Sequence, residues 1–172
     1  MRGQIFFYGR RATVRRKDKE ITEKTKIDSI LKESRICRLG MVDGDRAYVV
    51  PVNFGYRNNS LYIHSASGGK KIELLKNSKG VTFQADIDTE IVSAEKACRF
   101  TMKYRSVMGY GRVVFLQTEE NKREALNIIM EKYSGRRDWD FPDRELAKTV
   151  LIRIDIDEVS GKISGWKEEE NP

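Results

Sequence analysis

Residues 62–71 combine groups that could bind a phosphate: a strand-like run ends in small and hydroxyl residues, and two lysines follow. Ser65 supplies a hydroxyl, and Lys70 and Lys71 open a predicted helix whose first N–H groups carry a partial positive charge. Because the GxxxxGK[ST] motif is absent, the segment is not a P-loop. An ordinary loop before a solvated helix explains the same residues, so both interpretations stay open.

His64 lies just before these groups and is the only histidine in the chain. A single histidine excludes a histidine-rich metal site and a relay between two histidines, and we predict no metal site. A lone histidine in a strand is often structural. However, imidazole also donates to anions and changes charge near neutral pH, so a catalytic role for His64 stays open beside the structural one.

Two further segments offer polar groups on predicted strands. Pro51 removes a donor from its strand, which indicates an edge or a bulge and leaves backbone groups free to bind a planar heterocycle. A bend at the corner of a barrel explains Pro51 equally well. Arg105 and Ser106 provide a cation and a hydroxyl, for which a surface ion pair is the alternative.

Composition limits the classes of protein that the chain can belong to. A hydrophobic content of 39 % supports one core, and no apolar run approaches the roughly 18–20 residues that cross a bilayer. The apolar stretch near the N-terminus is too short for a secretory signal, so we expect a cytoplasmic protein. Cys37 and Cys98 form no zinc or disulfide pattern. The net charge of +7 favours an anionic partner: nucleic acid, an acidic membrane surface or a phosphorylated small molecule.

Hydrophobic periodicity predicts a mainly β protein with flanking helices. Strands are predicted over 37–42, 47–56, 60–65, 81–87, 103–116 and 150–157. Helices are predicted over 25–34, with Thr25 as the cap and Asp28 completing a capping box, over 70–77, and from the cap Thr118 to Tyr133. Residues 88–96 are predicted to form a loop. Strands linked by hairpins favour an antiparallel sheet, which can close into a barrel.

The domain prediction places one domain over residues 17–161. A basic N-terminal arm, 1–16, precedes it, and a C-terminal tail, 162–172, follows it.

Taken in order, these segments resemble the flavin-binding split-barrel superfamily that includes pyridoxamine 5′-phosphate oxidase. The resemblance is closest to its nitroimidazole-resistance (Nim) proteins. It is carried by residues 35–41, 48–56, 61–66 with 69–71, and 104–107 with 109–111. The resemblance implies a six-stranded antiparallel split β-barrel that forms a homodimer, with flavin mononucleotide (FMN) at the interface.

The resemblance also implies roles for named residues. A strand that includes Val50, Pro51, Val52 and Asn53 would contact the isoalloxazine ring through its backbone. His64, Ser65, Lys70 and Lys71 occupy the places of the phosphate-binding residues. Lysine in place of the arginine found there keeps the charge but loses the bidentate fork. Arg105 and Ser106 fall where the superfamily brings a polar strand residue to the cofactor.

The leading hypothesis is an FMN-dependent oxidoreductase that reduces small aromatic substrates, including nitro-aromatic compounds such as 5-nitroimidazole. In it, His64 is the catalytic residue, as a proton donor or substrate contact. The alternative is a non-catalytic module that binds flavin, or haem with His64 as the axial ligand. A third hypothesis is nucleic-acid binding through the basic residues of 10–19, but no nucleic-acid motif accompanies them.

Overall fold

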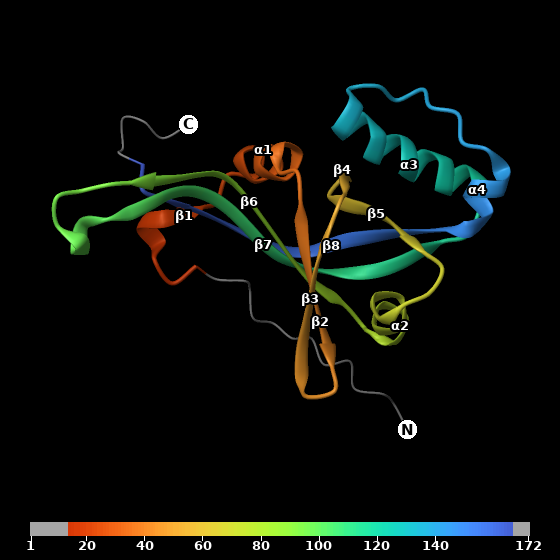
Figure 1. The fold of residues 1–172 in the computed structure, drawn as a ribbon, viewed down its shortest axis with the longest axis horizontal. Coiled ribbons are helices and arrows are strands. Elements are labelled where there is room, and N and C mark those ends of the chain that lie inside the picture. The colour runs from red at the N-terminus through yellow and green to blue at the C-terminus, as the bar shows by residue number, and fades with distance from the viewer. Residues whose placement is uncertain (1–13, 167–172) are drawn as a thin grey trace.

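The protein is described here from a computed structural model that covers residues 14–166. Most of the predicted basic arm and the last six residues of the predicted tail lie outside the described residues. One antiparallel sheet dominates the fold (Figure 1). Within the described range, its strands are β1 (Glu20–Ile21), β2 (Cys37–Asp43), β3 (Arg46–Val52), β4 (Gly55–Arg57), β5 (Ser60–Ala66), β6 (Val81–Val92), β7 (Thr101–Leu116) and β8 (Thr149–Ser164).

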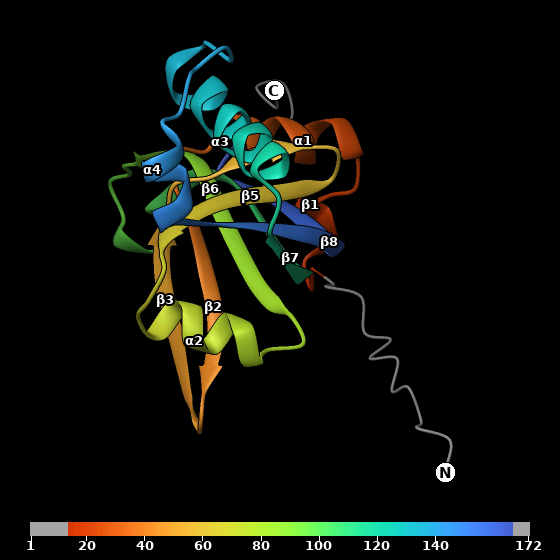
Figure 2. The same cartoon turned by 90° about the vertical axis from the view of Figure 1, so that its right-hand side faces the viewer.

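The helices lie on two sides of this sheet: α1 and α3 on one side and α2 on the other (Figures 1 and 2). The α-helices are α1 (Lys24–Glu33), α2 (Lys70–Asn77), α3 (Glu119–Ser134) and α4 (Asp143–Lys148), and single 3₁₀ turns occupy Lys17–Lys19 and Ala97–Arg99. None of the helices between residues 14 and 166 is long and apolar enough to cross a membrane.

The strands follow the order β3-β2-β6-β7-β8-β5-β4, and β1 pairs beside β8. β3 and β4 therefore stand at opposite ends of the hydrogen-bonded order, although only two residues separate them in the chain. Among the described strands β3 pairs with β2 alone, which confirms the edge position predicted from Pro51. No described ladder joins β3 to β4 or β5, so hydrogen bonds do not close the sheet into a barrel.

The sheet has eight strands where six were predicted. The predicted strand 47–56 divides, because the chain leaves β3 after Val52 and re-enters the sheet as β4 at Gly55. β1 is the second addition, and its two residues are too few to show alternation. β2, β5 and β7 match their predicted positions within two residues, since alternating burial gives each of them a clear period of two. β8 begins as predicted but continues to Ser164, seven residues beyond the predicted end and into the predicted tail.

The end of β6 corrects another prediction. Residues 88–96 were predicted as a loop, but β6 continues to Val92 and pairs with β7. The pairing register shifts between Ile87 and Glu90, and Asp88 has φ 56°. This bulge interrupts the alternation of apolar and polar residues, which is why the sequence pattern hides the second half of the strand.

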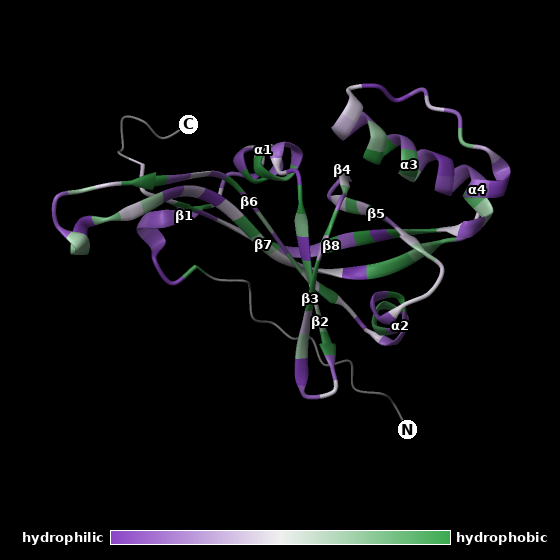
Figure 3. Ribbon diagram, in the orientation of Figure 1, coloured by the Kyte–Doolittle hydropathy of each residue, from purple (hydrophilic) through white to green (hydrophobic). Residues whose placement is uncertain are grey.

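The core fills the inner face of the curved sheet, where Cys37, Leu39, Phe83 and Ile152 are fully buried. Figure 3 shows apolar residues alternating with polar ones along these strands. Gly109 is required by this packing, because a Cβ there would lie 2.4 Å from both Phe83 Cζ and the Glu158 carbonyl oxygen.

The two longer helices differ in how they begin. Thr118 caps α3, since its Oγ1 accepts a hydrogen bond from the Asn121 amide at 3.3 Å, as predicted. Gly135 ends α3 in the left-handed region at φ 71°. The prediction that Thr25 caps α1 is wrong: α1 begins at Lys24 after Glu23, and no side chain caps it.

Candidate functional site

The β3 edge presents the backbone segment that was predicted to contact a planar ring. Val52 is buried and Val50 half-buried, so both side chains point to the core, whereas Pro51 and Asn53 are exposed. Because β3 has a neighbour on one side only, the N–H and C=O groups along its other edge have no ladder partner in the described sheet. Such groups can hydrogen-bond a ligand laid along the strand.

The strand end and helix start predicted as a phosphate cradle form as expected. β5 ends at Ala66, and α2 begins at Lys70 after Gly69, whose φ of 104° suits glycine. The amides of Ile72 and Glu73 bond to the Gly69 carbonyl. The first helical residues before them have no partner within the helix, so their N–H groups can bind an anion.

Lys70 is the lysine that fixes this helix in place. Its Nζ lies 2.7 Å from Asp43 Oδ1 and 3.8 Å from Glu73 Oε1, and the hydrogen bond to Asp43 raises the pKa of Lys70. Tyr48 of β3 also acts on Lys70 electrostatically. The ion pair therefore ties the first turn of α2 to the turn end of the β2–β3 hairpin, whereas Val50–Val52 of the predicted ring segment pair with the opposite end of β2.

His64 and Lys71 form the second part of the cradle. Lys71 is half-buried, and burial lowers the pKa of its ammonium. Burial and then the nearby Lys71 lower the pKa of His64. Neither residue has an ion pair with a carboxylate in the described part of the chain. An anion placed between them would relieve this repulsion and raise both pKa values.

Ser65 does not face the same way as His64. The two residues alternate along β5, with His64 opposite Leu151 and Ser65 opposite Val150 on β8. Directly opposed residues share a face, so His64 and Ser65 point to opposite faces of the sheet. The predicted grouping of Ser65 with both lysines is therefore rearranged: Lys71 lies with His64, and Lys70 with Asp43.

A hollow with a volume of ≈ 430 Å³ also lies at this helix start, with Ser67, Lys70 and Glu73 in its lining. His64, Ser65 and Lys71 do not line it. The Glu73 carboxylate would repel an anion in this hollow.

Arg105 and Ser106 lie apart from the other predicted residues. Arg105 Nε donates to Asp88 Oδ2 at 2.5 Å, and its Nη2 lies 3.6 Å from Glu33 Oε2. The ion pair considered as the alternative for Arg105 is thus present, and it ties β7 to the β6 bulge and to α1. Ser106 is half-buried on β7, which β2 and β6 separate from β3.

An apolar patch that the sequence analysis missed lies on the outer face of the same sheet. One row of opposed residues runs Val49, Gly40, Thr82 and Tyr110 across four strands, and the next runs Pro51, Arg38, Gln84 and Met108. Val49, Met108 and Tyr110 are 59 %, 40 % and 42 % exposed. The signal was available, because Val49 and Pro51 at one end of these rows and Met108 and Tyr110 at the other are apolar and exposed, although Arg38, Thr82 and Gln84 between them are polar.

Comparison with known proteins places the chain in a family. Residues 23–163 match the family model described as pyridoxamine 5′-phosphate oxidase, which covers most of the chain. The chain belongs to this family. This match to the pyridoxamine 5′-phosphate oxidase family confirms the resemblance drawn from the four sequence segments. No curated protein matches the chain.

Three solved structures resemble this family member. A candidate 5-nitroimidazole antibiotic resistance protein from Bacteroides thetaiotaomicron is 33 % identical, with 84 % of this chain and 86 % of that chain covered and a TM-score of 0.75. A FAD-binding protein from Mesorhizobium loti is 26 % identical, with 83 % and 96 % covered and a TM-score of 0.61. A FAD and heme binding protein from Mycobacterium smegmatis is 22 % identical, with 87 % and 76 % covered and a TM-score of 0.79, and shares the fold.

Proposed function

We propose that this family member binds FMN and works as a flavin-dependent reductase of small aromatic substrates. The observation that carries the proposal is the free edge of β3, on the same β2–β3 hairpin to which the Lys70–Asp43 ion pair ties the first turn of α2. A flavin needs both features at once: anion-binding groups for its phosphate and hydrogen-bonding backbone for its flat ring. The relatives named for FAD binding and for nitroimidazole resistance support the same class of ligand and substrate.

The phosphate would lie beside Lys71 and the first amides of α2. Lys71 supplies a positive charge that no described carboxylate neutralises, and the helix N-terminus adds its partial positive charge. This donor set matches one terminal phosphate, which is why we propose FMN. Lys70 acts indirectly here: it positions the helix through Asp43.

The ring would lie along β3, with backbone groups from Val50 to Asn53 as hydrogen-bonding partners. The exposed side chains of Pro51 and Asn53 leave this edge open to a ligand. When bound, the isoalloxazine ring supplies the electron-transfer chemistry. The protein's part is to hold the ring, exclude water from one of its faces and offer a proton.

His64 is the residue that we propose to supply that proton. His64 is exposed near the end of β5, so a substrate can reach it, although neighbouring atoms desolvate the imidazole enough to lower its pKa. A bound phosphate next to Lys71 would raise the pKa of His64 and keep a proton on it near neutral pH.

We further propose that the protein is a homodimer whose subunits meet through the apolar patch on β2, β3, β6 and β7. Exposed apolar residues in adjacent rows are typical of protein interfaces. The patch is continuous with Pro51 of the β3 edge, so a second subunit would cover the ring site. Ser106 shares this outer face, since it is directly opposite Asp86, which bonds to Arg38.

The visible spectrum of the purified protein, before and after incubation with FMN, tests the proposal. We expect flavin absorption bands that stay with the protein during gel filtration and that bleach on anaerobic addition of a reduced nicotinamide. The bands should return when a nitro-aromatic acceptor is then added, because the acceptor reoxidises the flavin. A Soret band without flavin bands would favour the haem-binding module. Bound flavin that no donor reduces would favour the non-catalytic one.

A further inference from the structure

A second, larger hollow lies between α1, the turn that joins β4 to β5, and α3. Its volume is ≈ 650 Å³, and Asp28, Lys32, Tyr56, Ile128, Glu131 and Lys132 are in its lining. We call it the α1–α3 cleft. α1 and α3 lie on the side of the sheet away from α2 (Figures 1 and 2), so the cleft is separate from the proposed flavin site.

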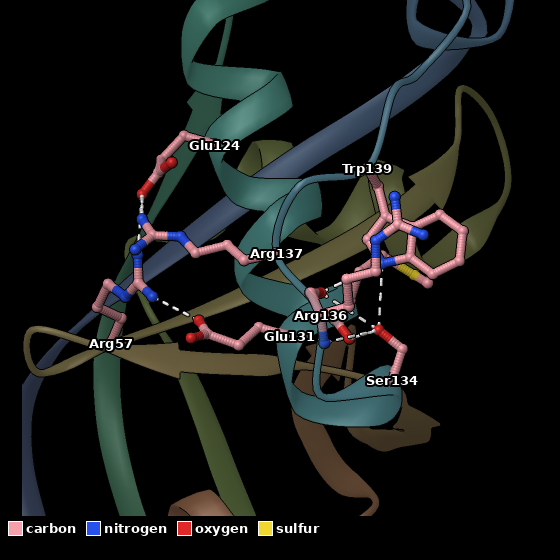
Figure 4. Close-up of polar contacts among 8 residues, drawn as sticks. Arg57, Glu124, Glu131, Ser134, Arg136, Arg137 and Trp139 are labelled. Atoms are coloured by element: carbon pink, nitrogen blue, oxygen red, sulfur yellow. Dashed lines mark hydrogen bonds and ion pairs between the residues drawn. The ribbon is translucent and has the colours of Figure 1, made fainter.

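Each carboxylate of the cleft wall already has a cationic partner. Asp28 accepts hydrogen bonds from Lys24 Nζ at 2.8 Å and from the Tyr56 hydroxyl at 2.5 Å. Glu131 accepts from Arg57 Nη2 at 2.5 Å. Figure 4 shows the Arg57 guanidinium held between Glu131 and a second glutamate of α3, so Arg57 has no free charge to offer a ligand.

Three cations around the cleft have no such partner. A smaller hollow of ≈ 360 Å³ shares Lys32 and Lys132 with the cleft and adds Arg35. Within the described residues, none of these three cations forms an ion pair. Glu33 also lines the smaller hollow, but its carboxylate pairs with Arg105. The junction of the two hollows therefore carries unbalanced positive charge.

Lys132 is the most constrained of the three. Its Nζ donates to the Leu31 carbonyl at 2.7 Å, one of the last carbonyls of α1, and lies 3.3 Å from the centroid of the Phe54 ring. Burial lowers the pKa of this ammonium to about 7. The titratable and charged groups around it are Lys32 and Glu33 of α1, Arg35 after it, Cys37 of β2, and Glu131 and Tyr133 of α3.

We propose that the α1–α3 cleft binds a small organic anion with more than one acidic group, held by Lys32 and Lys132 with Arg35 at the rim. The acidic groups can be carboxylates or phosphates, because both accept charge-assisted hydrogen bonds from ammonium groups. Tyr56 and Ile128 supply apolar contact for the body of the molecule. The site is a hollow of ≈ 650 Å³ between two helices, a size that suits a small molecule.

Calorimetric titration of the full-length, FMN-saturated protein with citrate and with pyrophosphate tests this proposal. FMN saturation blocks anion binding at His64 and Lys71, and sodium chloride at matched ionic strength controls for screening. We expect saturable binding of at least one probe, weakened about tenfold by Lys32→Gln. The matched control is Lys79→Gln, an exposed lysine outside both hollows, which should leave the affinity unchanged.

Measuring the protons taken up on binding distinguishes an anion bound in the cleft from anions attracted generally to a basic surface. Binding at pH 8 should take up protons, because an anion restores the charge of Lys132, and the uptake should disappear in Lys132→Met. Calorimetry in two buffers of different ionisation enthalpy measures it. If Lys132→Met does not fold, the loss of affinity in Lys32→Gln still tests the proposal. The proposal is overturned if neither probe binds, or if binding persists unchanged in Lys32→Gln.

Discussion

Lys71 in the first turn of α2 lies close enough to His64 on β5 to lower the pKa of the imidazole. Both groups are basic, and neither is paired with a carboxylate in the described structure, which favours an anion beside them. This proximity would allow one short segment to hold the flavin phosphate and also to supply the proton in the proposed reaction. In the proposed function, Lys71 would bind the phosphate, and the same phosphate would raise the pKa of His64.

Lys71→Gln tests this pairing directly. Removing the ammonium should weaken FMN binding about tenfold, since one charge-assisted hydrogen bond to phosphate is lost, and should raise the pKa of His64 in the FMN-free protein. Fluorescence titration measures the first effect, and the imidazole signal of this single histidine in a proton NMR titration measures the second. Lys79→Gln serves as the control; an unchanged imidazole titration in Lys71→Gln would contradict the pairing.

Gly109→Ala tests the packing that curves the sheet. The added methyl group would clash with Phe83 and with the Glu158 backbone at 2.4 Å, so we expect a loss of about 2–3 kcal/mol in the free energy of unfolding. Gly68→Ala is the control, because a Cβ there meets nothing within 4 Å. Urea denaturation followed by circular dichroism compares the two variants, and equal stabilities would contradict the packing argument.

Because the pKa of Lys132 is lowered in the folded protein, we expect the free energy of unfolding to rise with pH. Its pKa is about 7 in the folded protein against 10.5 for the unperturbed group, so between these values the unfolded chain binds more protons than the folded one. The free energy of unfolding should therefore gain a positive slope from pH 7 towards pH 10.5. Lys132→Met should remove this contribution and Lys32→Gln should keep it, which urea denaturation at pH 7, 8 and 9 can measure.

Met108→Glu tests the dimer interface. A carboxylate in the apolar patch would lose solvation on association, so we expect sedimentation to show monomers and FMN affinity to fall with the loss of the second subunit. The control places the same charge on exposed Ala147 of α4, away from the patch. If the wild-type protein sediments as a monomer, the proposed dimer is wrong.

Local patterns in the sequence were sufficient for much of the fold. Alternation located most strands, Pro51 marked the edge strand, and Thr118 marked the start of α3. These signals depend on residues within a few positions of each other. The β6 bulge at Asp88 and the two-residue β1 were missed, because a bulge breaks the period and two residues cannot show one.

The site was predictable as a set of segments but not as an arrangement. Nothing near Lys70 in the sequence indicates that Asp43 neutralises it, or that Glu33 and Asp88 hold Arg105. These partners meet only after the sheet has formed. The α1–α3 cleft has the same origin: Lys32 and Lys132 look like ordinary surface lysines until two helices from distant parts of the chain face each other.

Equilibrium titration of the flavin-free protein with FMN, followed by quenching of flavin fluorescence, tests the central claim most directly. The account predicts saturable binding of one FMN per chain with a dissociation constant on the order of micromolar or tighter, and weaker binding in Lys71→Gln. Absence of saturable quenching by the folded wild-type protein, or equal affinity in Lys71→Gln and Lys79→Gln, would contradict it.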